Sequence, residues 1–244
     1  MWVLAEYQPT TLFSLRPATA TTSGGKSLIV PTPFAVKMAL LDIAIRTQGL
    51  EAGRALFSAL RGLRIALCLP ERIVVNSTFA KIWRINDGVR KKGKVEEKRL
   101  IAEAKVKRKW PYQDTIAYRE YVQFGGSLVL AFQGMTLDDL SALLLQLNYL
   151  GKRGGFMQLQ RPPETVTELP TRFAEMTASV SGAFPLGVLQ LVDDFGPTMT
   201  FEHADIYCEK GIRLGKERVF HHVVLPYQVV RSSRSFTLYE RFET

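Results

Sequence analysis

The 244-residue sequence is poor in the residues that build most catalytic and metal sites, with only two cysteines and three histidines. Cys68 and Cys208 lie 140 positions apart among apolar neighbours, so they match neither a metal-binding motif nor a disulfide framework, and we expect buried thiols. The histidines, His203, His221 and His222, come without an HExxH, GxSxG or paired-cysteine motif. We therefore predict no metal site and no cofactor. His221 and His222 remain the candidates for a general acid or base, although neighbours on a strand point to opposite faces.

Long apolar segments are also missing. No run reaches the roughly 18 residues that a membrane-spanning helix needs. The first residues, MWVLAEYQPTT, lack the basic start and the apolar stretch of a secretory signal peptide. We expect a cytoplasmic protein without a membrane partner. The composition, 46% hydrophobic and 23% charged, is that of an ordinary globular protein.

Acidic residues are too few to balance the basic ones. The chain has 32 Lys and Arg against 23 Asp and Glu, a formal net charge of +9. Residues 90–109 alone contain ten basic and three acidic residues, so this segment carries +7 and the rest of the chain only +2. Such a concentration favours an element that follows the phosphate backbone of a nucleic acid. A solvated helix face with Glu–Lys pairs is the alternative.

Strand-like and helical patterns alternate in the first two thirds of the chain. MWVLAEYQ is typical of a strand, and Thr32 and Pro33 start a helix that ends before Gly49. A second helical pattern runs from Glu51 to about Gly62, and RIALCLPERIVV follows as extended chain.

The next segment, at about 77–112, has the pattern of a hairpin or arm. Asn86-Asp87-Gly88 is a turn signal between an aromatic strand and a basic return, and VEEKRLIAEAKVKRK is either helical or disordered. Two strands follow at 115–124 and 127–132. Thr136 then caps a helix that we expect to end at Gly151, and FMQLQ is the next strand.

Without the arm, the order is strand, helix, strand, strand, helix, strand. This order predicts an α+β, ferredoxin-like (RRM-like) domain with a four-stranded antiparallel sheet and both helices on one face. We assign this domain to residues 1–161, with the basic arm as an insertion, and a β-rich C-terminal segment to residues 162–244. In that segment LGVLQLVDDFG, RVFHHVVLPYQVV and RSFTLYERF are predicted strands, the last two paired across Ser232-Ser233.

The sequence YLGKRGGF places two basic residues inside a glycine-rich turn. Gly151 suits a helix C-terminus, whereas Gly154 and Gly155 add positions where backbone amides could approach a phosphate chain closely. Lys152 and Arg153 supply cations. The turn is no Walker loop, because GK[ST] is missing, and no dinucleotide fingerprint, because it lies between helix and strand. A simple helix cap is the alternative interpretation.

Aromatic and basic residues are also interleaved along the arm and just after it: Phe79, Trp83, Arg84, Trp110, Tyr112, Tyr118, Arg119 and Tyr121. Such mixtures stack on the bases of single-stranded nucleic acid. Alternating aromatics in strands are also common in protein cores, and we expect about half of these residues to be buried there.

Together, the predicted fold, the inserted arm and GKRGGF resemble the RAMP superfamily of CRISPR-associated proteins. PTPFAVKMALL is similar to the proline-led first helix of its Cas-five family, and TIAYREYVQFGGSLVLAF and LPYQVVRSSRSFTLYERF fit the same family.

The resemblance implies a non-catalytic subunit of a type I Cascade effector complex that holds the 5′ handle of a CRISPR RNA (crRNA). It implies that the arm is a thumb that packs against the first backbone (Cas-seven type) subunit. The large subunit is a further partner, and target DNA is reached through the assembled complex. The residues that we predict to bind RNA are Lys152, Arg153, Gly154, Gly155, Trp83, Arg84, Arg90, Lys91, Lys92, Lys107, Arg108 and Arg119.

Two alternatives stay open. One branch of the family cuts precursor RNA with a tyrosine, a lysine and a histidine, so a metal-independent endoribonuclease that uses His221 or His222 is the second hypothesis. No motif places such a triad here, and we favour structural or RNA-contacting histidines. A ferredoxin-like RNA-binding module unrelated to CRISPR is the third.

Overall fold

The computed structural model describes residues 1–20, 25–86, 94–180 and 186–242, and only the backbone of residues 94–96. Its first sheet has the strand order β6-β1-β5-β2-β8, and every neighbouring pair is antiparallel. The strands are β1 (Trp2–Pro9), β2 (Arg64–Cys68), β5 (Leu128–Gln133), β6 (Met157–Leu159) and β8 (Ala174–Glu175), and β7 (Glu164–Val166) also pairs with β1. The order β6-β1-β5-β2 confirms the predicted ferredoxin-like fold.

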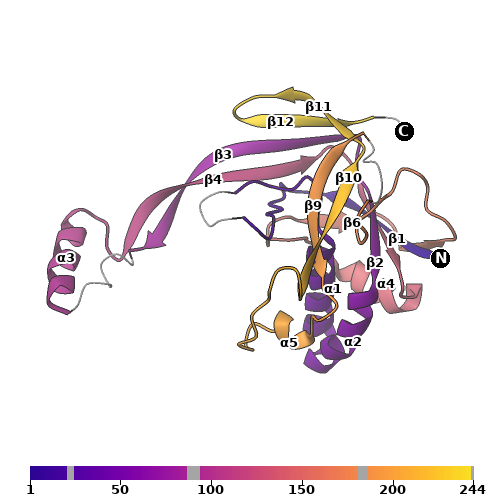
Figure 1. Cartoon of the computed structure of the whole chain (residues 1–244), viewed down its shortest axis with the longest axis horizontal. Helices are drawn as coiled ribbons and strands as arrows, with labels where there is room; N and C mark the ends of the chain where they lie inside the picture. Colours follow the sequence, from indigo (N-terminus) through magenta and orange to yellow (C-terminus); the bar gives the residue numbers. More distant parts are fainter. Residues whose placement is uncertain (21–24, 87–93, 181–185, 243–244) are drawn as a thin grey trace.

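Helices α1 (Pro33–Gln48), α2 (Leu50–Gly62) and α4 (Leu137–Gln146) gather at one side of this sheet (Figure 1). Alternate residues of β1, Val3, Ala5 and Tyr7, belong to the main hydrophobic core, because successive side chains of a strand point to opposite faces. The Tyr7 hydroxyl donates to the Leu144 carbonyl of α4 at 2.8 Å, and burial raises the pKa of Tyr7. On the opposite face a smaller cluster forms around Trp2, covered by Val166, Leu169 and Phe173.

The boundaries of these helices follow from capping residues that can be recognised in the sequence. Thr32 caps α1 by accepting from the Ala35 amide at 3.2 Å, and α1 gives way to α2 at Gly49, whose φ is 93°. Thr136 and Asp139 form a capping box at the start of α4. Both starts confirm the predictions.

The predicted end of α4 at Gly151 is wrong, because the helix ends at Gln146. Leu147 is already extended, with φ −74° and ψ 102°, yet it is buried, as is Leu150. The Leu150 amide donates to the Gly155 carbonyl at 3.1 Å. In a continued helix this amide would donate to the Gln146 carbonyl, so the bond to Gly155 replaces a further helical turn.

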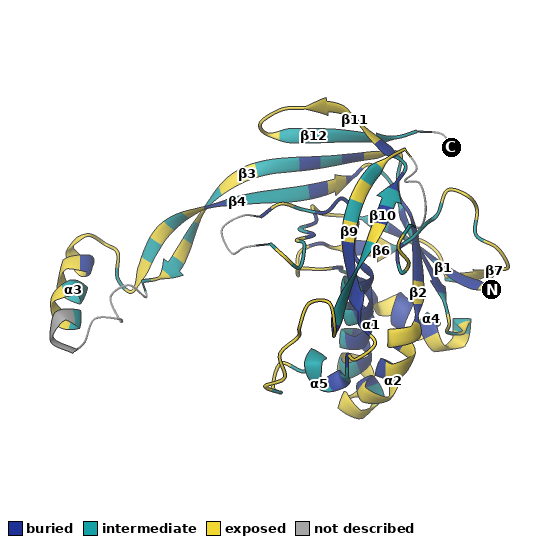
Figure 2. Cartoon of the chain, in the orientation of Figure 1, coloured by how far each residue is buried: buried dark blue, intermediate teal, exposed yellow. Residues whose placement is uncertain are grey.

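The arm is a long hairpin of β3 (Arg72–Ile85) and β4 (Tyr112–Phe124), paired in register from Ile73↔Phe124 to Ile85↔Tyr112. Helix α3 (Lys94–Val106) lies at its far end, well away from the body (Figure 1). For this segment the sequence left helix and disorder open, and the structure has a helix. None of the described residues between Asn76 and Tyr121 belongs to the main core, and Figure 2 shows little buried surface along the outer arm.

The C-terminal part adds two hairpins. Strands β9 (Val188–Phe195) and β10 (Arg218–Leu225) pair with each other, with the short helix α5 (Phe201–Ala204) between them, and Val192, Phe195, Val223 and Leu225 join the main core. Strands β11 (Tyr227–Ser232) and β12 (Phe236–Arg241) pair as predicted, and β12 adds to β3 in the sheet β11-β12-β3-β4. The segment after residue 161 therefore builds on the same core.

In the described part of the chain, no helix has both the length and the apolarity to cross a membrane.

Candidate nucleic-acid interface

The glycine turn, residues 151–155, is closed by its own backbone. Gly151 and Gly154 have φ angles of 70° and 112°, in a region that favours glycine. The Gly155 amide donates to the Lys152 carbonyl at 3.2 Å. Lys152 and Arg153 therefore stand exposed at the tip of a tight turn.

The two adjacent glycines serve different purposes. A β-carbon at Gly154 would meet no atom within 4 Å, so the space beside this backbone position is open. A β-carbon at Gly155 would lie 2.9 Å from Phe13 Cδ1 and 3.0 Å from the Leu150 carbonyl oxygen. Gly155 is buried, so its missing side chain makes room for Phe13 and not for a ligand.

Residues 11–13 contact both the glycine turn and the root of the arm. Thr11 Oγ1 donates to the Gly154 carbonyl at 2.6 Å and accepts from the Phe156 amide at 2.7 Å. Two residues further on, Phe13 and Val122 of β4 exchange both backbone hydrogen bonds, at 2.8 and 2.7 Å. The glycine turn and the root of the arm are thus fixed to one another through residues 11–13. No pattern in the sequence predicts this link.

Tyr149 braces the turn from its other side. Its hydroxyl donates to Asp42 Oδ2 of α1 at 2.9 Å, and Asp42 is also paired with Arg46 at 2.8 Å. Burial, followed by the bond to Asp42, raises the pKa of Tyr149, and the neighbouring Arg153 opposes that rise. The turn is therefore anchored to α1 as well as to β4.

The predicted arm residues divide between its two ends. Lys107 and Arg108 are exposed beside α3, while Arg84 and Arg119 are half-buried on β3 and β4. Arg90, Lys91 and Lys92 lie outside the described residues. Figure 1 shows α3 far from α4 and β6, so the structure does not bring the arm tip and the glycine turn together.

Near the root of the arm, the chain at Gly25 lies against β4. The Glu120 amide of β4 donates to the Gly25 carbonyl at 2.9 Å, and a β-carbon at Gly25 would lie 3.0 Å from Arg119 Cδ. The exposed Lys26 therefore follows directly after the residue that packs on Arg119. The position of Lys26 near the arm follows from the long-range pairing of residues 25 and 120, and no local sequence pattern predicts it.

One face of the arm is apolar and exposed. The register pairs Lys81 with Ile116 and Trp83 with Asp114, and Lys81 and Asp114 form an ion pair of 2.7 Å across the ribbon. Around this pair the large exposed side chains are Phe79, Trp83, Ile85, Tyr112 and Ile116, with Phe79 and Trp83 75% and 68% exposed. Phe79, Trp83 and Tyr112 therefore lie outside the core, whereas Tyr118 and Tyr121 are half-buried.

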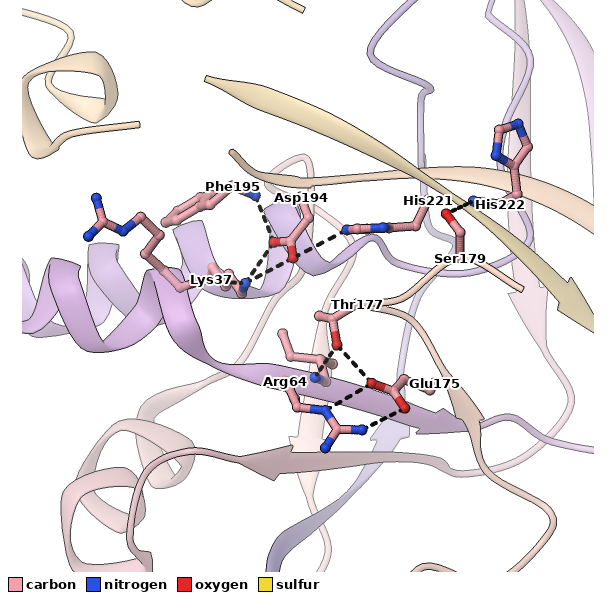
Figure 3. Close-up of polar contacts among 11 residues, drawn as sticks. Lys37, Arg64, Glu175, Thr177, Ser179, Asp194, Phe195, His221 and His222 are labelled. Carbon is pink, nitrogen blue, oxygen red and sulfur yellow. Dashed lines mark hydrogen bonds and ion pairs between the residues drawn. The ribbon is translucent and has the colours of Figure 1, made fainter. Parts of the chain in front are cut away.

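The two candidate histidines, His221 and His222, lie in different surroundings. His221 Nε2 lies 3.8 Å from Asp194 Oδ2, which is ion-paired with Lys37 of α1 (Figure 3). Lys37 is 1% exposed, and burial lowers the pKa of His221. His222 is exposed on the other face of β10, where its amide donates to Ser179. As expected for strand neighbours, the two imidazoles point apart.

Metal-binding groups are likewise missing among the described residues, where no cluster of three His, Cys, Asp or Glu could hold a metal ion. Cys68 is buried, as predicted. Cys208 is only half-buried, so its predicted burial is wrong, because the loop that carries it lies on the surface beside α5.

No protein-family model matches the chain. Over 225 residues it is 25% identical to the CRISPR-associated protein Cas5 of Archaeoglobus fulgidus. The aligned region covers 90% of this chain and 91% of that protein. Among solved structures, it is similar to a CRISPR protein from Archaeoglobus fulgidus, with a TM-score of 0.47, 14% identity and coverage of 99% and 92%. It is also similar to a chain of the type III-B Cmr-beta complex bound to cognate target RNA, with a TM-score of 0.33, 11% identity and coverage of 98% and 86%.

The chain thus combines a ferredoxin-like fold and an inserted arm with a likeness to a Cas5 protein that runs along most of both sequences. This likeness supports the resemblance to the Cas-five family of RAMP-type CRISPR-associated proteins.

Proposed function

We propose that this chain is a non-catalytic RNA-binding subunit of a CRISPR effector complex. The observation that carries the proposal is the junction of two basic elements: the root of the arm and the glycine turn meet through Phe13 and Val122. An RNA strand that passes this junction contacts cations from both. Phosphate contacts there would supply affinity without reading sequence.

In its finer form, the proposal is that the chain holds the 5′ handle of the crRNA in a type I Cascade complex. The arm then acts as the thumb that docks on the first, Cas-seven type backbone subunit, next to the large subunit. The apolar face of the arm supports a protein contact, because Ile85 and Ile116 are exposed there and aliphatic side chains offer bases no stacking surface. Target DNA is then a partner of the assembled complex only.

Salt-dependent binding of single-stranded repeat RNA tests the RNA contact. We expect the double variant Lys152→Ala, Arg153→Ala to bind more weakly, and the slope of log K against log salt to fall by up to about 1.4, since each phosphate contact to a single strand contributes about 0.7. The control is Lys210→Ala, Lys216→Ala, which removes two exposed cations from the loop before β10. An unchanged slope in the first variant would contradict the proposal for the glycine turn.

The same RNA separates binding from cutting. In EDTA, we expect the wild-type protein to leave repeat RNA intact. A discrete cut that disappears in His221→Ala or His222→Ala would replace the binding role with that of a metal-independent endoribonuclease.

A further inference from the structure

A cleft opens beside the glycine turn, between the first half of α1 and the loop at residues 14–16. It has a volume of about 570 Å³, within the range of about 300 to 1,000 Å³ that is usual for small-ligand sites. Gly151 and Lys152 form one rim, so the cleft is continuous with the turn that we propose to contact RNA.

The lining combines apolar walls with cations. Leu15, Phe34 and Met38 provide apolar surface, while Arg16, Lys152 and Arg218 are basic. The acidic residue of the lining, Asp42, is already engaged by Arg46 and by the Tyr149 hydroxyl. The cleft is therefore suited to a ligand with an apolar, flat part and a negative charge.

Arg218 forms a flat platform inside the cleft. Its guanidinium carbon lies 3.9 Å above the centre of the Phe34 ring, and its Nε and Nη2 lie 2.6 and 2.5 Å from Asp193 Oδ2. The Asp193 side chain is only 2% exposed, whereas that of Arg218 is 24% exposed. The buried carboxylate and the ring hold the guanidinium in place, and its remaining face can stack on a planar group without further ordering.

We infer that this cleft takes one unstacked nucleotide of the bound RNA. The base stacks on the Arg218 platform against Met38, and the adjoining phosphate lies at Lys152 and Arg16. Splayed bases stacked on aromatic rings or guanidinium planes are the usual mode of single-strand recognition. The inference rests on the proposed function and extends it from backbone contact to the capture of a base.

A cleft-filling substitution tests the inference. Met38 is half-buried on the lining, so Met38→Trp places a ring where the base would lie while it keeps all three cations. With mixed-sequence single-stranded RNA in fluorescence anisotropy, we expect about tenfold weaker binding, the effect of losing one stacked base, and an unchanged salt slope. The matched control is Leu50→Trp, at an exposed position beyond the far end of α1, which should bind like the wild type.

Photocrosslinking of the wild-type protein gives a second readout that does not depend on how the variant folds. RNA with 4-thiouridine should crosslink to peptides that contain Phe34, Met38 or Tyr149. Wild-type affinity in a folded Met38→Trp variant, or crosslinks found only elsewhere, overturns the nucleotide site and leaves the proposed RNA binding intact. Failure of the wild-type protein to bind any RNA overturns both.

Discussion

At the scale of single residues, Gly155 shows how packing fixes the glycine turn. An alanine there would place its methyl group against Phe13 and the Leu150 carbonyl, and the carbonyl belongs to the backbone. We expect Gly155→Ala to lower the free energy of unfolding by about 1 to 3 kcal/mol, as overpacking does, in urea titration followed by circular dichroism.

Gly62→Ala is the matched control for this prediction. A β-carbon at Gly62 meets nothing within 4 Å, and this glycine closes α2, where alanine has the better helix propensity. It should be neutral or slightly stabilising. Equal stability of the two variants would contradict the role given to Phe13.

Glu217 makes a residue-scale prediction about pH. Its buried carboxylate accepts from the Arg213 guanidinium at 2.6 and 3.1 Å and from the Arg213 amide at 3.0 Å. These bonds lower the pKa of Glu217 from 4.5 to about 2. Because the folded pKa is the lower one, the bonds stabilise the fold above about pH 4.5, and this contribution is lost as the pH falls from 4.5 towards 2.

Thermal unfolding of Glu217→Gln at several pH values checks this prediction. The variant should melt below the wild type near neutral pH, and the difference should shrink steadily as the pH falls below about 4.5. Gln keeps the size of the side chain and removes the titrating group. A gap in Tm that stays constant over this range would show that the charge of Glu217 is irrelevant to the fold.

At the scale of elements, a buried ion pair ties helix α1 to the β9–β10 hairpin. Lys37 Nζ lies 2.8 Å from Asp194 Oδ1, and Asp194 Oδ1 also accepts from the Phe195 amide at 2.7 Å. Lys37→Met would leave Asp194 buried without its cation, so we expect a loss of about 3 to 5 kcal/mol in urea unfolding.

The double variant Lys37→Met, Asp194→Leu tests whether the loss comes from the orphaned charge. Replacing both partners with apolar side chains should recover most of the stability, because no buried charge is left unpaired. If Lys37→Met alone stays within about 1 kcal/mol of the wild type, the pair does not hold the hairpin to the helix.

How far the sequence predicts these elements depends on the range of the interactions that decide them. The start of α1 at Thr32 and the capping box at Thr136 are local, and the sequence predicts both. The end of α4 is decided by the buried Leu147 and by the bond from Leu150 to Gly155, which joins residues on either side of a turn, and there the prediction fails.

The candidate site follows the same rule. Lys152 and Arg153 could be singled out from local composition, because glycines and cations alternate within one turn. The roles of Phe13 and Arg218 could not, since each depends on a partner more than twenty residues away: Val122 for Phe13 and Asp193 for Arg218.

At the scale of the whole molecule, the body and the arm are separable. The main core joins the ferredoxin-like sheet, α1, α4 and the β9–β10 hairpin, while no described residue between Asn76 and Tyr121 takes part in it. Replacing residues 86–111 by an Asn-Gly turn joins Ile85 to Tyr112, which already face each other in register. We expect the free energy of unfolding to change by less than about 1 kcal/mol, because no described residue of the main core is lost and a long connection is removed.

The same deletion should affect RNA binding strongly. It removes ten basic and four acidic residues, so the formal charge falls from +9 to +3, and both affinity and salt slope should fall. The control keeps the arm and replaces Lys105, Lys107, Arg108 and Lys109 by Gln. If this charge variant binds RNA as the wild type does while the deletion does not, the tip acts through its shape or through a protein partner. Full affinity in the deletion itself would leave the glycine turn and its cleft as the sole RNA contact.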